Sequence, residues 1–183
     1  DERTVTIRNE YVKHISKMFQ LTGIDAATAD TYAQTIMKME TDFAGASRKL
    51  ADLRDPYANY NSMAVADVNK LCPAINWESF LADAGIKNID TIIVGQPEFF
   101  KQLNTSLTKE SVDNWKIYLQ WNLINAYADR LSSDFDKEHF HFYGTILNGT
   151  KEQRARWKRV LDAEEDAMGF LLGQLYVEAY YPP

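Results

Sequence analysis

One run of apolar residues, spaced alternately four and three positions apart, constrains the fold of this chain more than any other feature. It consists of Tyr32, Ile36, Met39, Phe43, Ala46, Leu50 and Leu53. Steps of four and three place side chains on one face of an α-helix. We therefore predict a helix from about Asp25 to Leu53, about 40 Å long at 1.5 Å per residue. The pair Asp55-Pro56 should end it.

Other segments of the N-terminal half also have helical spacing. An apolar stripe from Tyr11 to Phe19 precedes the long helix, and two long antiparallel helices would bury both stripes against each other. Shorter helices are predicted further on, because Ser62 and Asn76 are suitable N-caps and Pro97 is a suitable first helical residue.

A long helix is predicted in the middle of the C-terminal half. Thr108 is its expected N-cap, and its apolar side chains continue as far as Phe135 over a wide arc. A helix that is apolar over so much of its surface should be the central, most buried one. Asn122 and Asn125 lie on or near that buried region and need hydrogen-bond partners there.

The last predicted helix opens with a capping box at residues 150–153, TKEQ. It is rich in leucine, and Gly169 and Gly173 stand four positions apart within it. This spacing lets a second helix approach the backbone closely. We therefore interpret the two glycines as packing positions.

Only one segment, residues 90–95 (DTIIVG), is typical of a β-strand. A single strand cannot satisfy its own backbone donors and acceptors. It is therefore either an extended connector or the partner of a strand elsewhere, inside or outside this chain. The predicted fold class is all-α, a bundle of long antiparallel helices with short connecting helices and at most one short strand. Residues 1–183 are expected to form a single helical lobe.

Charge and composition exclude several kinds of partner. The net charge is −6, from 26 acidic and 20 basic residues dispersed along the chain, which argues against binding to nucleic acid or to an anionic membrane. No apolar run approaches the roughly 20 residues that cross a bilayer. Cys72 is the only cysteine, so no internal disulfide can form, and we interpret it as a small buried hydrophobic residue.

Residues 136–149 (DKEHFHFYGTILNG) hold two of the three histidines and raise the question of a metal site. On a helix, His139 and His141 would point about 200° apart and could not bind one ion together. The zinc motif HExxH is absent. The alternating phenylalanines favour a helix–loop junction, and His14 is expected on a solvated helix face. We interpret the histidines as structural or surface residues, with metal binding as the alternative.

Two glutamates interrupt the apolar stripe of the last predicted helix. Glu164 and Glu178 belong to a seven-residue repeat with Trp157 and Leu171, and buried carboxylates need partners. We expect structural ion pairs with Arg54, Arg154 or Arg156. The alternative is a general acid–base pair in a carboxylate-based hydrolase. The chain has no GxSxG, GxGxxG or P-loop motif.

A series of segments between about Arg54 and Tyr181 carries more information than any one motif. In order, they are RDPYANYNSM, NWESFL, TIIVGQPEFFKQL, LTKESVDNWKIYLQWNLINAYADRLSSDF, FYGTILNGTKEQRARWKRV and MGFLLGQLYVEAYY. This series closely resembles the N-terminal, non-catalytic helical region of the neprilysin and endothelin-converting-enzyme family of zinc metallopeptidases. Bacterial endopeptidase O belongs to the same family.

The resemblance implies a parent enzyme that hydrolyses peptide bonds in small peptides with a zinc-bound water. In the family, the two His of HExxH and a later Glu bind zinc, and the Glu of the motif is the general base. These residues lie C-terminal to the matched region. We therefore assign no catalytic, cofactor-binding or metal-binding residue to this chain, and we expect it to be inactive alone. Residues 125–128, NAYA, resemble the family's substrate-binding NAYY stretch only superficially.

The resemblance also implies that the chain is an internal fragment of a several-fold longer metallopeptidase. Its partners would be the missing catalytic lobe and peptide substrates, because the helical lobe caps a closed chamber and limits substrate size. Val160 stands where eukaryotic members have a disulfide cysteine, which favours an exported bacterial member, periplasmic or on the cell surface. The alternative is a stand-alone helical protein-interaction or scaffold module.

Overall fold

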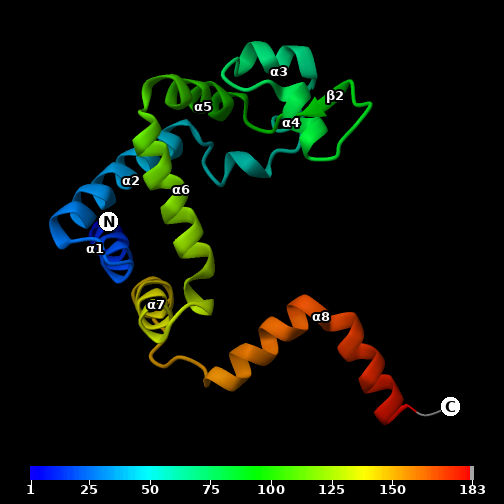
Figure 1. Ribbon diagram of the computed structural model, residues 1–183. Coiled ribbons are helices and arrows are strands. Elements are labelled where there is room, and N and C mark those ends of the chain that lie inside the picture. The colour runs from blue at the N-terminus through cyan, green and yellow to red at the C-terminus, as the bar shows by residue number, and fades with distance from the viewer. Residues whose placement is uncertain (182–183) are drawn as a thin grey trace.

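The computed structural model describes residues 1–181, which form helices and one small sheet (Figure 1). The elements are α1 (Glu2–Leu21), α2 (Ala26–Ala46), a 3-10 turn (Asp52–Arg54), β1 (Ser62–Ala64), α3 (Val65–Leu71), α4 (Trp77–Asp83), β2 (Thr91–Ile93), α5 (Pro97–Lys109), α6 (Val112–Tyr127), a second 3-10 turn (Ala128–Arg130), α7 (Ser133–His139), a π-helix (Phe140–Leu147) and α8 (Arg156–Tyr180). The prediction of an all-α fold is confirmed.

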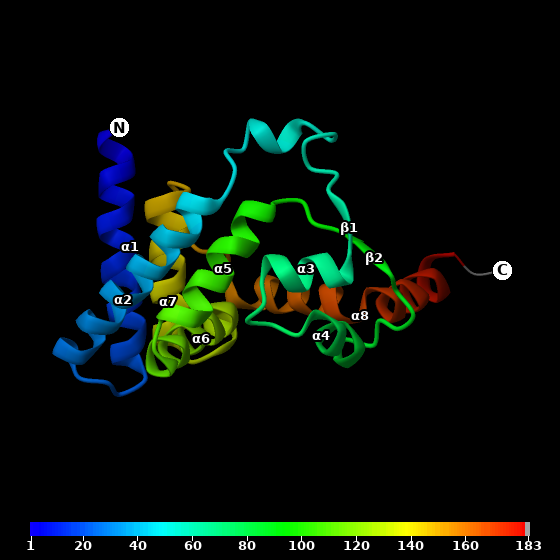
Figure 2. The same ribbon diagram turned by 90° about the horizontal axis from the view of Figure 1, so that it is seen from above.

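Helices α1 and α2 form the predicted antiparallel pair (Figure 2). Each begins at an aspartate whose side chain accepts a backbone N–H of the first turn: Asp1 from Arg3, and Asp25 from Thr28, both at 3.0 Å. Such caps satisfy donors that the first turn leaves free. The connection contains Gly23 with φ +94°, a left-handed conformation that glycine adopts without steric cost.

Helix α2 is shorter than the helix that the stripe of apolar residues predicted. It ends at Ala46, because the backbone N–H of Arg48 donates to the side chain of Gln96 at 2.8 Å, and the guanidinium group of Arg48 binds Glu98. These contacts with residues about fifty positions away replace further helical turns. Leu50, predicted to continue the buried face, is 75% exposed.

The strand predicted at residues 90–95 has its partner inside the chain. Strand β2 pairs with β1 in an antiparallel ladder that aligns Met63 with Ile92. Two short strands therefore occur where at most one was predicted, and Ser62 belongs to β1 rather than capping a helix. The other two predictions in this region are confirmed: Asn76 caps α4 by accepting from Ser79 N at 3.0 Å, and Pro97 starts α5.

Helix α6 differs from its prediction in two ways. Thr108 lies inside α5 and donates to the carbonyl of Asn104, while Ser111 caps α6 by accepting from Asn114 N at 3.1 Å. The helix is also not the most buried one, because Trp121 is its one buried residue. The core comes mainly from α1 and α2 instead. Asn122 is exposed and donates to the carbonyl of Tyr118.

Two separate clusters of buried residues stabilise the fold. The first joins α1, α2 and α6 and contains Ile15, Met18, Phe19, Ala29, Ala33, Ile36, Trp121 and Ala128. The second lies under the small sheet and contains Val65, Val68, Cys72, Trp77 and Val94. The prediction that Cys72 is a buried hydrophobic residue is confirmed, since it is 0% exposed and burial raises the pKa of its thiol.

Helix α8 extends away from both clusters (Figure 1), and none of its residues is buried. The predicted capping box does not form, because the helix begins only at Arg156 and Gln153 donates to Asp136 instead. At Met168 the backbone leaves helical values, with φ −134° and ψ 22°, and the helix bends. Among residues 1–181, none of the helices combines the length and apolarity that a bilayer crossing demands.

Candidate functional site at the junction of α7, the π-helix and α8

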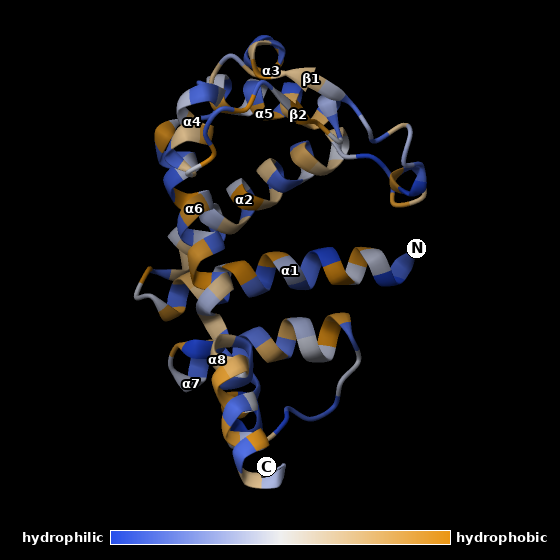
Figure 3. Cartoon of the chain, turned by 90° about the vertical axis from the view of Figure 1, so that its right-hand side faces the viewer, coloured by the Kyte–Doolittle hydropathy of each residue, from blue (hydrophilic) through white to orange (hydrophobic). Residues whose placement is uncertain are grey.

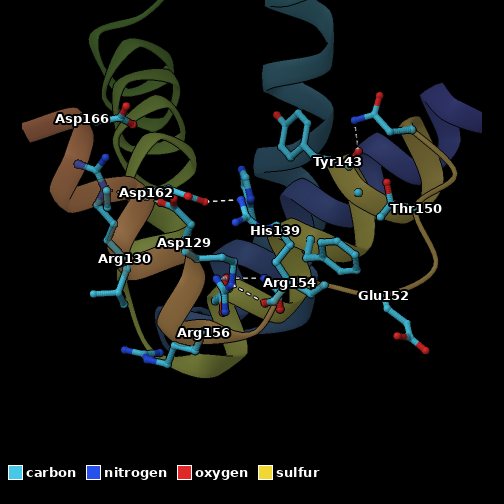
Figure 4. Close-up of a pocket in the computed structure, with 18 residues that line it drawn as sticks. Asp129, Arg130, His139, Tyr143, Thr150, Glu152, Arg154, Arg156, Asp162 and Asp166 are labelled. Atoms are coloured by element: carbon cyan, nitrogen blue, oxygen red, sulfur yellow. Dashed lines mark hydrogen bonds and ion pairs between the residues drawn. The ribbon is translucent and has the colours of Figure 1, made fainter. Parts of the chain in front are cut away.

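A pocket of about 670 Å³ opens between the π-helix and the first half of α8 (Figure 4). His139, Phe140, Tyr143, Gly144 and Asn148 of the histidine-containing stretch line it. Charged side chains from Ala128–Arg130 and α8 lie on one side, and Tyr143 and Thr150 lie on the other. Its charged residues are Asp129, Arg130, Asp136, Glu152, Arg154, Arg156, Arg159, Asp162 and Asp166.

Asp136 and Arg159 both line this pocket and form an ion pair. The guanidinium Nη1 and Nη2 atoms of Arg159 donate to the two carboxylate oxygens of Asp136 at 2.7 and 2.9 Å. Gln153 donates to the same carboxylate at 2.8 Å. Asp136 is buried, so these donors replace the water that its charge would otherwise require. The pair fixes the start of α8 against α7.

The segment that follows α7, Phe140–Leu147, is a π-helix where the sequence predicted a helix–loop junction. Gly144 makes its tight packing possible, since a Cβ atom there would lie 2.5 Å from the ring of Phe140. Phe142 is buried and Phe140 is half-buried. The segment ends at Gly149, whose φ of +71° is left-handed. π-Helices are rare and occur frequently at functional sites.

The structure places the three histidines in three different environments. His14 was predicted on a solvated face but is 2% exposed, because its Nδ1 atom donates to Glu138 at 2.9 Å and its ring stacks on Phe142. His139 faces the pocket, and burial lowers its pKa, with a smaller effect from nearby His14. His141 is exposed.

The described part of the chain, residues 1–181, contains no cluster of three or more His, Cys, Asp or Glu side chains that could hold a metal ion. Within the same residues, Nε2 of His14 is buried without a hydrogen-bond partner. The ring nevertheless lies between aromatic side chains, 5.6 Å from Trp121 and 4.9 Å from Phe142 between centroids. Its surroundings are those of a core histidine.

The two glutamates of the last helix do not form the expected ion pairs. Glu164 is half-buried, Glu178 is exposed, and neither has a salt-bridge partner within residues 1–181. Arg154, one expected partner, pairs with Asp162 instead. The bend at Met168 separates the two glutamates, and neither lines the pocket. They therefore do not share an open cleft.

A series of hydrogen-bonded polar side chains next to the first cluster was not predicted from the sequence. The hydroxyl of Tyr11 donates to Glu40 at 3.0 Å and accepts from Trp121 Nε1 at 3.3 Å. Burial raises the pKa of Glu40 and also that of Tyr11. Asn125, which was expected to need a partner, donates to the hydroxyl of Tyr143 at 2.9 Å. Each of these contacts joins helices, and together they position side chains without pairing a nucleophile with a base.

Comparison with known proteins gives one consistent result. The sequence model of peptidase family M13, N-terminal region, matches residues 1–183. Endothelin-converting enzyme 1 of Rattus norvegicus is 26% identical over 99% of this chain and 24% of its own length. Human neprilysin is 29% identical over 80% of this chain and 21% of its own length. The chain thus spans about a quarter of the length of the curated relatives it matches.

Solved structures show the same likeness. The zinc metalloprotease Zmp1 of Mycobacterium tuberculosis in its open state superimposes with a TM-score of 0.89 at 30% identity, over 100% of this chain and 29% of that protein. The inhibitor complex of Zmp1 gives a TM-score of 0.88 at 28% identity, over 99% and 28%.

Proposed function

Because the chain belongs to peptidase family M13, to its N-terminal region, we propose that it is the helical lobe of a zinc metalloendopeptidase that hydrolyses peptide bonds in small peptides. The observation that carries the proposal is the superposition on Zmp1, which extends over the whole of this chain and over 29% of that zinc metalloprotease. Residues 1–183 are then a single lobe within a longer polypeptide.

The zinc of this enzyme is proposed to lie outside residues 1–183. The sequence contains no HExxH motif, and the three histidines have separate environments in the fold. Zinc supplies an activated water and polarises the scissile carbonyl when it is bound. The residues of this chain contribute shape instead: the first cluster and the Asp136–Arg159 pair hold the lobe rigid, so that it can cap a chamber and exclude large substrates.

The parent is further proposed to be an exported bacterial protein, periplasmic or on the cell surface. Val160 replaces the disulfide cysteine that the resemblance predicts for eukaryotic members. The superposition on a mycobacterial protein supports the bacterial part of this assignment. Peptide substrates and the remaining lobe are its proposed partners.

The test uses the full-length parent and the isolated 183-residue chain side by side. We expect the parent to cleave short peptides, to lose this activity with a zinc chelator and to regain it with added zinc. A series of longer peptides should show an upper size limit. The isolated chain should neither cleave peptides nor retain stoichiometric zinc after gel filtration. Tight one-to-one zinc binding by the isolated chain would contradict the proposal, and a gene that encodes no HExxH motif beyond this segment would favour a stand-alone helical module.

A further inference from the structure

The end of the π-helix holds the one asparagine of the sequence that is followed by glycine, Asn148-Gly149. An asparagine can lose its side-chain amide without an enzyme, because the backbone nitrogen of the next residue can attack its side-chain carbonyl carbon. Glycine in the next position favours this attack, since it has no side chain to obstruct the approach and restricts the backbone least. Asn148 is therefore the asparagine of this chain whose sequence context most favours the reaction.

The reaction balances with water as its only co-reactant. The amide nitrogen of Gly149 gives its proton to a solvent base and forms a bond to Cγ of Asn148, while the bond between Cγ and Nδ2 breaks and ammonia leaves. The product is a five-membered cyclic imide. Water then opens the imide at one of its two carbonyl carbons. Opening at Cγ leaves an aspartate, and opening at the main-chain carbonyl leaves an isoaspartate, whose backbone is one carbon longer.

In the folded chain, the backbone conformation at Asn148 prevents the attack. Closing a five-membered ring requires the nitrogen of Gly149 to be nearly eclipsed with Cβ of Asn148 about the Cα–C bond. The ψ angle of Asn148 is −9°, which eclipses this nitrogen with the backbone nitrogen of Asn148 instead. The same nitrogen donates its hydrogen to the carbonyl of Thr145 at 3.0 Å. The reaction therefore needs a rotation about ψ that breaks this hydrogen bond.

Two further hydrogen bonds hold this end of the π-helix closed. Nδ2 of Asn148 donates to the carbonyl of Tyr143 at 2.7 Å, and the backbone N–H of Thr150 donates to the carbonyl of Gly144 at 2.8 Å. Asn148, Gly149 and Thr150 are exposed, and Figure 3 shows the connection from the π-helix to α8 as a hydrophilic loop outside the helices. Opening this end breaks hydrogen bonds of exposed residues, which costs less free energy than unfolding the buried clusters.

We propose that Asn148 is a modification site, which converts to aspartate and isoaspartate through local opening of the end of the π-helix and not through unfolding of the whole lobe. The products cannot restore the closed end. A carboxylate has no hydrogen to donate to the carbonyl of Tyr143, and isoaspartate also lengthens the backbone. The modification adds a negative charge to a residue that lines the pocket between the π-helix and α8. The inference is independent of whether the parent cleaves peptides.

Mass spectrometry of the full-length parent measures the modification. Samples are held at mildly alkaline pH, in buffer and in unfolding concentrations of urea, and the digested peptide that contains Asn148 is analysed for aspartate and isoaspartate. We expect the rate in buffer to be at least about tenfold below the rate in the unfolded chain, because only the locally open fraction reacts. Equal rates in the two samples, or no reaction in the unfolded chain, would overturn the proposal.

The dependence of the rate on urea separates local opening from global unfolding. Urea promotes an opening in proportion to the surface that it exposes, so the opening of a short, already exposed segment responds weakly. Below the unfolding transition, we therefore expect a rate that is nearly constant as urea increases. A rate that rises in parallel with the unfolded fraction, or a reaction that begins only at the transition, would assign the chemistry to global unfolding and overturn the proposal.

A matched pair of variants tests the location of the opening. Gly144→Ala strains the π-helix, because the added methyl group overlaps the ring of Phe140, whereas Val68→Ala removes methyl groups from the second buried cluster. Both should lower the Tm of the full-length parent. Only Gly144→Ala should raise the rate in buffer, by at least about fivefold, because it destabilises the closed end.

The variants can contradict the proposal in two ways. Equal acceleration by Gly144→Ala and Val68→Ala would mean that the reaction follows global stability, and no acceleration by Gly144→Ala would mean that the π-helix does not control it. If either variant fails to fold, the urea dependence of the unchanged protein decides the question by itself.

Discussion

Asp136 and Arg159 are joined by two hydrogen bonds, 2.7 and 2.9 Å long, across the junction between α7 and α8. They stand 23 positions apart in the sequence, and the carboxylate is the buried partner. This pair is a polar link between α7 and the projecting helix α8. The structure predicts how removing this pair changes the stability of the chain.

Asp136→Asn should lower the free energy of unfolding by about 2–3 kcal/mol. Removing one partner of a buried ion pair leaves the other charge uncompensated, which costs about 3–5 kcal/mol in a fully buried site. The cost is smaller here, because the Arg159 side chain is 24% exposed and water partly compensates its charge. Urea titration followed by circular dichroism measures the change. Asp134→Asn, an exposed change on the same helix, is the control and should cost less than about 1 kcal/mol.

His14→Ala should destabilise the chain by about 2–4 kcal/mol, in the range of other large-to-small core substitutions. The change empties a buried site against Phe142 and Trp121 and removes the donor to Glu138. His141→Ala, on the exposed side of the π-helix, should change stability by less than about 0.5 kcal/mol. Similar losses of stability for the two variants would show that His14 is not a core residue.

Gly144→Ala should destabilise the chain by about 1–3 kcal/mol, because the added methyl group overlaps the ring of Phe140 and the π-helix must shift. Gly45→Ala is the matched change on an open helix face, and it should stabilise by about 0.5–1 kcal/mol through helix propensity. The two variants therefore move the urea midpoint in opposite directions. A shift in the same direction would mean that Phe140 can rotate away freely.

The stability of the chain should depend on pH through His139. Burial lowers its pKa below the ordinary value of 6.5, so the folded chain binds fewer protons than the unfolded chain as pH falls through 6.5. Stability is therefore fully present above pH 6.5 and is lost as pH falls below it. Glu40 acts in the opposite direction. Burial raises its pKa above 4.5, so the folded chain binds this proton more readily than the unfolded chain, and lowering the pH through this range favours the folded state.

His139→Gln should remove the first of these two effects. Between about pH 7.5 and about pH 5.5, the Tm of the unchanged chain should fall more than that of the His139→Gln variant. His141→Gln serves as the control and should follow the unchanged chain. A variant whose Tm falls as steeply as that of the unchanged chain would assign the acid sensitivity to another group.

Some local features of the fold could be predicted from the sequence, whereas most of the long-range contacts could not. The cap at Asn76 and the helix start at Pro97 depend on neighbouring residues and were predicted correctly. The caps predicted at Ser62 and Thr108 and the capping box at residues 150–153 were wrong, although they are local features too. The end of α2 depends on the hydrogen bond between Arg48 and Gln96, and the β1–β2 sheet depends on the pairing of Met63 with Ile92. The spacing of apolar residues in the sequence reveals neither contact.

The candidate site followed the same rule. His14 looked solvated because its partner Glu138 lies 124 positions away in the sequence. Asp136 was noticed only as a neighbour of the histidines, and its pairing with Arg159 has no local signal. A glycine beside an aromatic run, Gly144, was the one visible indication that the backbone packs unusually at this place.

The two buried clusters share no buried residue, and this separation affects how the fold can evolve. Substitutions in the cluster around Trp77 have no direct contact with those around Phe19, so their effects on stability should add independently. Each cluster can then exchange its residues over generations without forcing the other to repack. Distant members of the family should therefore show correlated changes within each cluster and uncorrelated drift between them.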